Sequence, residues 1–309
     1  MRLGTRGSAL ALAQAELVAT ALGDAEIVAI ETSGDAALDP AHALTEAEQA
    51  AGPYLDKARF VREIERALLA GEVDLGVHSA KDLPADLPEG LEIAAVPARE
   101  DAADCYVGDA GSLADVGDGA RIGTASLRRR SQLLAARPDL EVAELRGNVD
   151  TRLGRLRDGD LDGIVLAAAG LRRLGRDDEI SFRFELGEMT PAAGQGALAL
   201  EARSGEPETA AAAAALTDRE ALVALTAERA TVAELGATCH TPVGVHVRVD
   251  GDVLRADAYV GMPDGSEWIR DGLEGSTEDP VALGIELASR LTAAGAIELL
   301  ERAEAEAPT

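Results

Sequence analysis

Short apolar segments alternate with longer amphipathic ones through the first hundred residues, and this alternation limits the folds open to the chain. Residues 26–31, 75–78 and 91–96 are short, apolar and bounded by polar residues or glycine, which is typical of buried strands. Residues 8–22 and 60–70 carry apolar side chains at helical spacing. Strands that alternate with helices form βαβ units, so this order predicts an α/β fold with a mainly parallel sheet.

The alternation starts again near residue 100, which predicts a second α/β unit. Its expected elements are three strands and two helices, at 121–123, 141–145, 163–168, 127–136 and 151–156. After about residue 218 the pattern changes to a helix, then a strand pair joined by a tight turn at 250–252, then a helix over 280–302. The C-terminal part is therefore expected to be a small α+β domain.

The charge of the chain limits the classes of molecule that it is expected to bind. Acidic residues outnumber basic ones by 56 to 29, and the net charge of −27 argues against nucleic acid or an anionic membrane as partner. Only Lys57 and Lys81 are lysines, and such an acidic, lysine-poor composition is expected either from adaptation to a high-salt cytoplasm or from a GC-rich genome. The excess of acids favours adaptation to salt, because base composition explains that excess less well. No apolar run approaches the roughly 20 residues of a membrane helix. The N-terminus lacks the apolar stretch of a signal peptide, so a cytoplasmic location is expected.

Arginines are concentrated in one part of this acidic chain. Residues 121–183 hold 13 arginines against 10 acidic residues, and several arginines directly follow expected strands. Ligands of open parallel sheets bind beyond the carboxyl ends of the strands, so an anionic ligand is expected there. Arg128, Arg129 and Arg130 occupy the first turn of an expected helix, where the helix dipole disfavours cations and a bound anion would offset them. The alternative is an ordinary surface helix.

Two further segments carry residues suited to chemistry. Lys81 and Asp82 follow a buried strand, where a carboxylate could accept an N–H hydrogen bond and stabilise a positive charge; alternatively, Asp82 caps the turn before Pro84. Cys239 lies in a small-residue loop that suits a nucleophilic thiolate, although a lone cysteine is more often a buried apolar residue. Cys105, in a strand-like segment, fits that second description. The spacing of the cysteines and histidines predicts no metal site.

Four motifs occur along the chain: HSAKDLP at 78–84, TASLRRR at 124–130, LRGNVDTRL at 145–153 and ATCHTP at 237–242. With these motifs the sequence resembles the porphobilinogen deaminase family nearly from end to end. The resemblance implies two hinged, doubly wound α/β lobes like those of periplasmic binding proteins, plus a small C-terminal α+β domain. The implied boundaries are 1–98 with 198–216 for lobe 1, 100–194 for lobe 2 and 218–309 for the C-terminal domain.

The resemblance also implies an activity. Members of this family are transferases of porphyrin and haem biosynthesis that condense four porphobilinogen molecules head to tail into hydroxymethylbilane, a linear tetrapyrrole, with release of ammonia. The product grows on a dipyrromethane cofactor held by a thioether, and Cys239 matches the attachment point. Asp82 matches the catalytic residue that steadies the pyrrole nitrogens and the cationic methylene-pyrrole left when ammonia departs. The implied partner is the small molecule porphobilinogen, and the implied state is a monomer.

The other residues carried over from the family would bind the acetate and propionate groups of the pyrroles. They are Arg6, Ser8, Lys81, Thr124, Ser126, Arg128, Arg129, Arg146, Arg152, Arg173 and, at a hinge-side position near the substrate, Gln195. The sequence departs from the family pattern at Ala125, in place of a serine, and at Ser33, where an arginine is common. A longer segment, 44–60, replaces the short glycine-rich loop of the family, and segment 36–56 is expected to be either a loop with a short helix or a mobile lid. Because of this insertion, the match of Lys57 and Phe60 to functional positions stays open.

Two other classes of protein fit parts of the sequence. A solute-binding protein would also use two hinged lobes to capture an anion, although the missing export signal and the loop of Cys239 argue against it. A cysteine-dependent hydrolase would use Cys239 and His240, but it leaves the arginine-rich segment without a purpose. Turnover of porphobilinogen separates the three classes.

Overall fold

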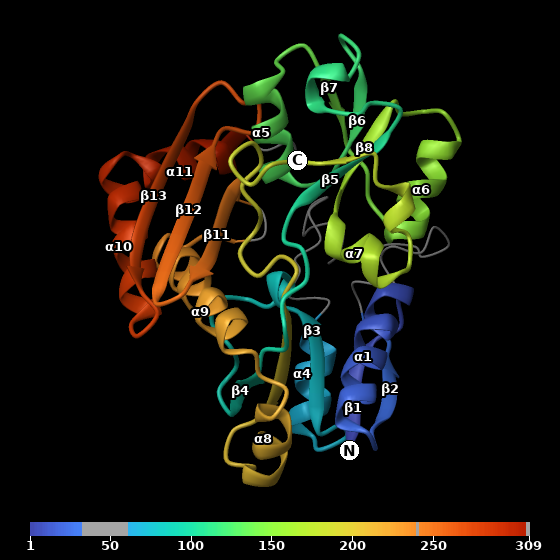
Figure 1. The fold of residues 1–309 in the computed structure, drawn as a ribbon, viewed down its shortest axis with the longest axis vertical. Helices are drawn as coiled ribbons and strands as arrows, with labels where there is room; N and C mark the ends of the chain where they lie inside the picture. The colour runs from blue at the N-terminus through green and yellow to red at the C-terminus, as the bar shows by residue number, and fades with distance from the viewer. Residues whose placement is uncertain (33–60, 239–240, 307–309) are drawn as a thin grey trace. The chain divides into compact units, whose positions relative to one another are not determined.

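The computed structural model describes residues 1–32, 61–238 and 241–306, and the chain divides into two compact units. Unit 1 comprises Met1–Glu100 and Ala197–Leu222, and unit 2 comprises Asp101–Gly196 and Val223–Pro308. Sheets and helices form the core of each unit (Figure 1). The chain crosses between the units after residues 100, 196 and 222.

Unit 1 contains a five-stranded sheet of order β2-β1-β3-β10-β4. Its strands are β1 (Arg2–Arg6), β2 (Glu26–Ile30), β3 (Leu75–Ser79), β4 (Leu91–Ala95) and β10 (Leu198–Arg203). β1 runs parallel to β2 and β3, as the βαβ pattern predicts, but β10 lies antiparallel between β3 and β4. The sheet is therefore mixed rather than mainly parallel, because β10 enters it from a distant part of the sequence.

Three helices pack against the strands of this sheet. They are α1 (Ala9–Leu22), α4 (Arg62–Leu69) and α8 (Pro207–Ala214). Ser8 caps α1, since its Oγ accepts a hydrogen bond from the Ala11 N–H at 3.3 Å. Apolar side chains of α1, β1, β3 and β10 form one buried cluster. A short 3-10 turn, Ala80–Asp82, follows β3 directly.

The first part of unit 2 holds a second five-stranded sheet, of order β7-β6-β8-β5-β9. Its strands are β5 (Asp104–Gly108), β6 (Arg121–Gly123), β7 (Glu141–Ala143), β8 (Gly163–Ala167) and β9 (Phe182–Arg183). Its helices are α5 (Leu127–Ala136), α6 (Val149–Arg157) and α7 (Ala168–Arg173). β6 runs parallel to β7 and β8, whereas β5 is antiparallel to β8 and β9. Because each helix follows one of the three parallel strands, all three helices begin at the same edge of the sheet.

The second part of unit 2 confirms the expected small α+β domain. Its elements are α9 (Arg219–Glu234), whose first residues belong to unit 1, then β11 (Val243–Asp250), β12 (Val253–Gly261), β13 (Trp268–Ser276), α10 (Pro280–Ala293) and α11 (Ala296–Glu306). The predicted tight turn joins β11 to β12, and Gly251 adopts a φ of 62° there. The prediction of one helix over 280–302 is wrong. Two helices, α10 and α11, cover this range, and Gly295, with a φ of 96°, lies at the break between them.

Within residues 1–32, 61–238 and 241–306, no single helix is long and apolar enough to cross a membrane. α10 and α11 together would meet the length and composition, but they are bent by 74° at their break. Leu283 and Leu287 of α10 and Leu299 of α11 belong to the buried core of the C-terminal sheet.

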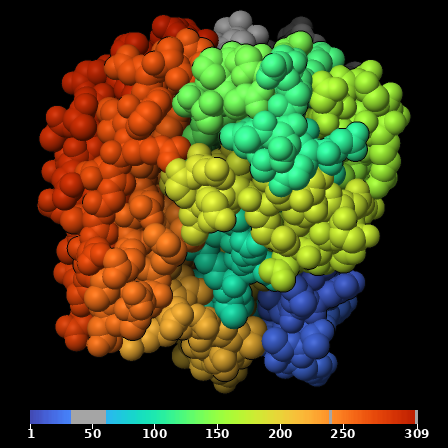
Figure 2. Space-filling view, turned by 45° about the horizontal axis from the view of Figure 1, so that its top comes forward, coloured from blue at the N-terminus to red at the C-terminus, as the bar shows by residue number. Residues whose placement is uncertain are grey.

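Within unit 2, the C-terminal sheet packs against α5. Tyr259 of β12 and Ser131 of α5 share a buried hydrogen bond of 2.7 Å between their hydroxyl oxygens. Arg270 of β13 lies over the rings of Tyr259 and Trp268 and donates to the Glu188 carbonyl at 3.0 Å. Figure 2 shows the C-terminal strands, in orange, side by side with the green region of α5. The two parts of unit 2 thus share polar and aromatic contacts.

Candidate functional site

The turn between β6 and α5 is fixed by its own side chains. Thr124 Oγ1 accepts a hydrogen bond from the Ser126 N–H at 3.1 Å, and Ser126 Oγ accepts one from the Arg129 N–H at 3.4 Å. Ser126 therefore caps α5. Arg128 and Arg129 follow in the first turn of the helix, and only 4% and 5% of their surfaces are exposed.

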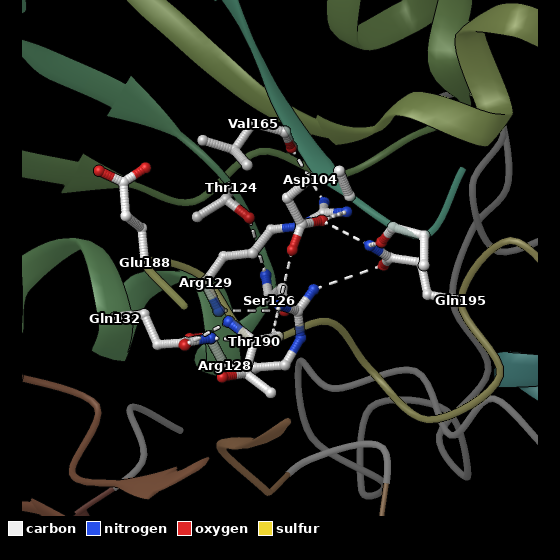
Figure 3. Close-up of polar contacts among 12 residues, drawn as sticks. Asp104, Thr124, Ser126, Arg128, Arg129, Gln132, Val165, Glu188, Thr190 and Gln195 are labelled. Carbon is white, nitrogen blue, oxygen red and sulfur yellow. Dashed lines mark hydrogen bonds and ion pairs between the residues drawn. The ribbon is translucent and has the colours of Figure 1, made fainter. Parts of the chain in front are cut away.

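Asp104, the first residue of β5, binds both of these arginines (Figure 3). Arg128 Nη1 lies 2.6 Å from Asp104 Oδ2, and Arg129 Nη2 lies 2.7 Å from Asp104 Oδ1. Burial alone would raise the pKa of this carboxyl, but the two guanidinium groups outweigh burial and lower the pKa to about 2. Asp104, Arg128 and Arg129 thus form an ion triad with an excess of one positive charge, which a bound anion would neutralise.

Gln195 and the backbone surround this ion triad. Gln195 Nε2 donates to Asp104 Oδ1 at 3.0 Å and to the Ala102 carbonyl at 2.7 Å. Arg128 Nη1 also donates to the Thr190 carbonyl at 2.7 Å, and Arg128 Nη2 donates to Gln195 Oε1 at 3.4 Å. The structure therefore brings the predicted residues Arg128, Arg129 and Gln195 together around one carboxylate (Figure 3).

The ion triad explains why α5 tolerates arginines in its first turn. Arg128 and Arg129 are bonded to Asp104, and Arg130 donates to the Val142 carbonyl at 2.9 Å. Asp104 was not predicted from the sequence, because it is a single polar residue at the start of a strand-like segment. The signal that could have found it is the excess of arginines itself, because buried cations need a carboxylate as well as a ligand.

Arg146 and Arg152 lie in the loop and helix that follow β7. Arg146 Nε donates to a Glu144 carboxylate oxygen at 2.6 Å; the Arg146 side chain is partly exposed, and that of Glu144 is exposed. Arg152 Nε donates to the Gly147 carbonyl at 2.8 Å. Because β7 and β6 are parallel neighbours, both arginines lie at the sheet edge where α5 begins. This placement agrees with an anion site at that edge.

Side chains from several elements of unit 2 form hydrogen bonds with the backbone of segment 190–196. Arg173, at the end of α7, donates to the Gly196 carbonyl at 2.7 Å. The fully buried Glu228 of α9 accepts a hydrogen bond from the Gly194 N–H at 2.7 Å and another from a backbone N–H of β11 at 2.8 Å. The segment that precedes the return to unit 1 is therefore tied to both parts of unit 2.

The predicted residues of unit 1 share one edge of its sheet. Arg6 is the last residue of β1, and Ser8 caps α1 two residues later. Lys81 and Asp82 belong to the short turn directly after β3, and both are partly exposed. Since β1 and β3 are parallel neighbours, the four residues lie at the carboxyl ends of adjacent strands, where ligands of such sheets bind.

The described cysteine, Cys105, is buried in β5, and burial raises the pKa of its thiol to about 12. It is therefore the inert core residue that the sequence predicts. The predictions that fall outside the described residues concern Cys239, His240, Ser33, Lys57, Phe60 and segment 36–56. Beside Cys239 and His240, the Thr238 N–H donates to Thr241 Oγ1 at 3.0 Å, and that hydroxyl donates to the Thr238 carbonyl at 2.7 Å. In the described part of the chain, no group of histidine, cysteine and carboxylate side chains could hold a metal ion.

The sequence matches two family models along most of its length. Residues 1–211 match "Porphobilinogen deaminase, dipyromethane cofactor binding domain", and residues 222–293 match "Porphobilinogen deaminase, C-terminal domain". A curated relative from Trichlorobacter lovleyi, named porphobilinogen deaminase, is 44% identical over 97% of this chain and 96% of its own length. Relatives of the same name from Roseiflexus sp. and Thermus thermophilus are 47% and 45% identical, each over 96% of this chain and 97% of their own length.

Solved structures that align with part of the chain share little sequence with it. An arginine-specific periplasmic binding protein of Salmonella typhimurium is 14% identical, with a TM-score of 0.38 over 70% of this chain and 90% of its own. A TRAP periplasmic solute binding protein of Desulfovibrio salexigens is 10% identical, with a TM-score of 0.40 over 70% of this chain and 71% of its own.

Proposed function

The chain belongs to the porphobilinogen deaminase family, and from this membership and the site geometry we propose which residues carry out the reaction. The protein is a transferase of porphyrin biosynthesis that condenses four porphobilinogen molecules head to tail into hydroxymethylbilane. In each condensation the aminomethyl C–N bond breaks and ammonia leaves. The methylene carbon then bonds to the α-carbon of a neighbouring pyrrole, which loses a proton. The protein must therefore bind carboxylates and stabilise a transient cation.

The ion triad of unit 2 is the proposed centre of carboxylate binding. Its buried excess of one positive charge is the observation that carries the proposal, because each pyrrole brings an acetate and a propionate. This donor set fits an anionic dipyrromethane cofactor, which supplies the primer for the first condensation when bound. The same binding role is proposed for Thr124, Ser126, Arg146, Arg152, Arg173 and Gln195. Cys239 is the proposed point of thioether attachment.

Asp82 is the proposed catalytic residue. It follows β3 directly, at the edge of the unit 1 sheet where ligands of such folds bind. Its carboxylate would accept the N–H of a pyrrole and stabilise the cation that forms when ammonia leaves porphobilinogen. Arg6, Ser8 and Lys81 lie at the same edge and are proposed to bind acetate and propionate groups there.

Finer properties of the protein are proposed from its charge and chemistry. Cys239 must be a thiol before it forms a thioether, and thiols persist in reducing compartments, which supports a cytoplasmic location. The net charge of −27 disfavours self-association and binding to nucleic acid or anionic membranes, which supports a monomer with porphobilinogen as its partner. The same charge, with two lysines in the whole chain, supports adaptation to high salt.

Intact-mass spectrometry of the purified protein, with peptide mapping, tests the cofactor assignment. The expected mass exceeds that of the sequence by two linked pyrroles, and the added mass maps to Cys239. Cys239→Ser is expected to lose the added mass and porphobilinogen turnover, whereas Cys105→Ala keeps both because Cys105 is buried in the core. An active wild-type protein without added mass contradicts covalent attachment. An inactive, unmodified protein that binds small carboxylates supports a solute-binding protein instead.

A further inference from the structure

One fully buried carboxylate at the start of β5 receives four side-chain donors. Arg128 Nη1 lies 2.6 Å from Asp104 Oδ2. Arg129 Nε and Nη2 lie 2.9 Å and 2.7 Å from Asp104 Oδ1, and Gln195 Nε2 lies 3.0 Å from the same oxygen. Asp104 therefore sets the place of three side chains that the family resemblance assigns to ligand binding (Figure 3).

The two arginines are held unequally. Arg129 directs Nε and Nη2 to Asp104 and Nη1 to the Val165 carbonyl at 2.9 Å, so each of its nitrogens has a protein acceptor. Arg128 directs Nη1 to Asp104 and to a backbone carbonyl, whereas its Nη2 contact with Gln195 Oε1 is long, at 3.4 Å. A carboxylate that approaches the Nη2 edge of Arg128 would replace a weak contact with a strong one.

We propose that Asp104 is a positioning residue, which holds Arg128 and Gln195 in place for a pyrrole carboxylate and uses Arg129 as its structural counter-charge. The inference rests on the proposed function, because the ligand group is an acetate or propionate of a pyrrole. Donors that are already in place need no rearrangement when a ligand binds, and a displacement of about 1 Å can cost on the order of 10²-fold in rate. Without Asp104, the two buried guanidinium groups would repel each other and move apart.

The position of Asp104 in the chain supports this role. Unit 2 begins at Asp101, three residues before Asp104, and its first part ends at Gly196, next to Gln195. Gln195 Nε2 donates to both Asp104 and the Ala102 carbonyl, at 3.0 Å and 2.7 Å. Arg128 is therefore placed by the segments at which the chain enters and leaves this part of unit 2.

Variants of Asp104 in the full-length protein test the proposal. Asp104→Asn removes the charge, whereas Asp104→Glu keeps the charge and moves the carboxylate by one methylene. A role in positioning predicts that both variants lower kcat/KM for porphobilinogen, by about 10–100-fold. The control is Asp271→Asn, which removes the carboxylate from a partly exposed bidentate pair with Arg290 and is expected to leave kcat/KM unchanged. Wild-type kcat/KM in Asp104→Glu would show that Asp104 supplies charge alone and would overturn the proposal.

A second measurement does not depend on turnover. In nitrogen-15-labelled wild-type protein, the buried Arg129 Nε–H that donates to Asp104 is expected to exchange slowly with water and to give its own NMR signal. The signal should disappear in Asp104→Ala, which removes the acceptor of the Nε–H, and persist in Asp271→Asn. Its absence from the wild-type protein, or its persistence in Asp104→Ala, overturns the proposal. Where Asp104→Ala does not fold, the wild-type signal and Asp104→Glu carry the test.

Failure of the proposed function would look different from failure of the positioning role. Turnover and the added pyrrole mass are measured on the wild-type protein in parallel with the variants. A wild-type protein with neither counts against the proposed function, and the NMR signal of Arg129 still reports whether Asp104 holds the arginines.

Discussion

Replacing Asp104 by asparagine should destabilise unit 2 strongly. The variant keeps the size of the side chain but leaves Arg128 and Arg129 buried without a counter-charge. Removal of one partner from a buried ion pair typically costs about 3–5 kcal/mol, mostly because the remaining charge is uncompensated. The free energy of unfolding is therefore expected to fall by about that amount at pH 7.

The loss of unfolding free energy caused by Asp104→Asn should become smaller as the pH falls. The pKa of Asp104 is lowered from 3.8 to about 2 in the folded protein. Its charge therefore stabilises the fold above about pH 4, and this contribution is lost as the pH falls toward 2. A difference of nearly two pH units between the pKa values corresponds to roughly 2 kcal/mol. The gap in unfolding free energy between wild type and Asp104→Asn is thus expected to narrow by about 2 kcal/mol from pH 5 to pH 2.

Urea unfolding followed by tryptophan fluorescence can measure this gap. Trp268 is the single tryptophan of the chain, and it stacks on Tyr259 within unit 2, so its emission reports the unfolding of that unit. Comparison of the two proteins at each pH cancels the titration of the other carboxyl groups. A gap that stays constant between pH 5 and pH 2 would refute the argument that the arginines hold Asp104 in its ionised form.

Three further predictions concern other parts of the chain. Asp82→Asn is expected to slow single-turnover condensation by about 10²–10³-fold, because it removes the charge that would stabilise the cation; near-normal turnover in the folded variant would make Asp82 a structural residue. Salt should screen the self-repulsion of a chain with net charge −27, so the Tm is expected to rise from low to molar KCl, and a flat or falling curve contradicts adaptation to salt. Tyr259→Phe removes the 2.7 Å hydrogen bond to Ser131 and is expected to lower the free energy of unfolding by about 0.5–1.5 kcal/mol with turnover intact; a loss of turnover at full stability would place Tyr259 in the site.

Local structure could be predicted where a few neighbouring residues decide it. The helices expected over 8–22, 127–136 and 151–156 are present, and Ser8, Ser126 and Asn148 each cap one of them by accepting a backbone N–H three residues ahead. The antiparallel place of β10 could not be predicted, because its partners β3 and β4 are far away in sequence and pairing at that separation leaves no local pattern. The break at Gly295 was hidden by helical spacing on both sides of it.

The site could be predicted in outline for a similar reason. Residues directly after strands, such as Arg6 and Asp82, are placed by the strands themselves, and the parallel order of β1 and β3 brings them to one edge. Asp104 escaped prediction because its role depends on the approach of α5 to the start of β5. That approach is a property of tertiary packing, and the sequence shows only an aspartate at the start of a strand.

The backbone of segment 190–196 is bound by side chains from several elements of unit 2. Its backbone carbonyls accept hydrogen bonds from Arg128 and Arg173, which are both proposed to bind carboxylates. A bound anion would therefore contact the same guanidinium groups that hold this segment in place. Glu228 binds the same segment and also β11, the strand that begins shortly after Cys239. Segment 190–196 therefore contacts the arginines proposed to bind the carboxylates of the cofactor. Through Glu228 it is also linked to the strand that follows the proposed attachment point, Cys239.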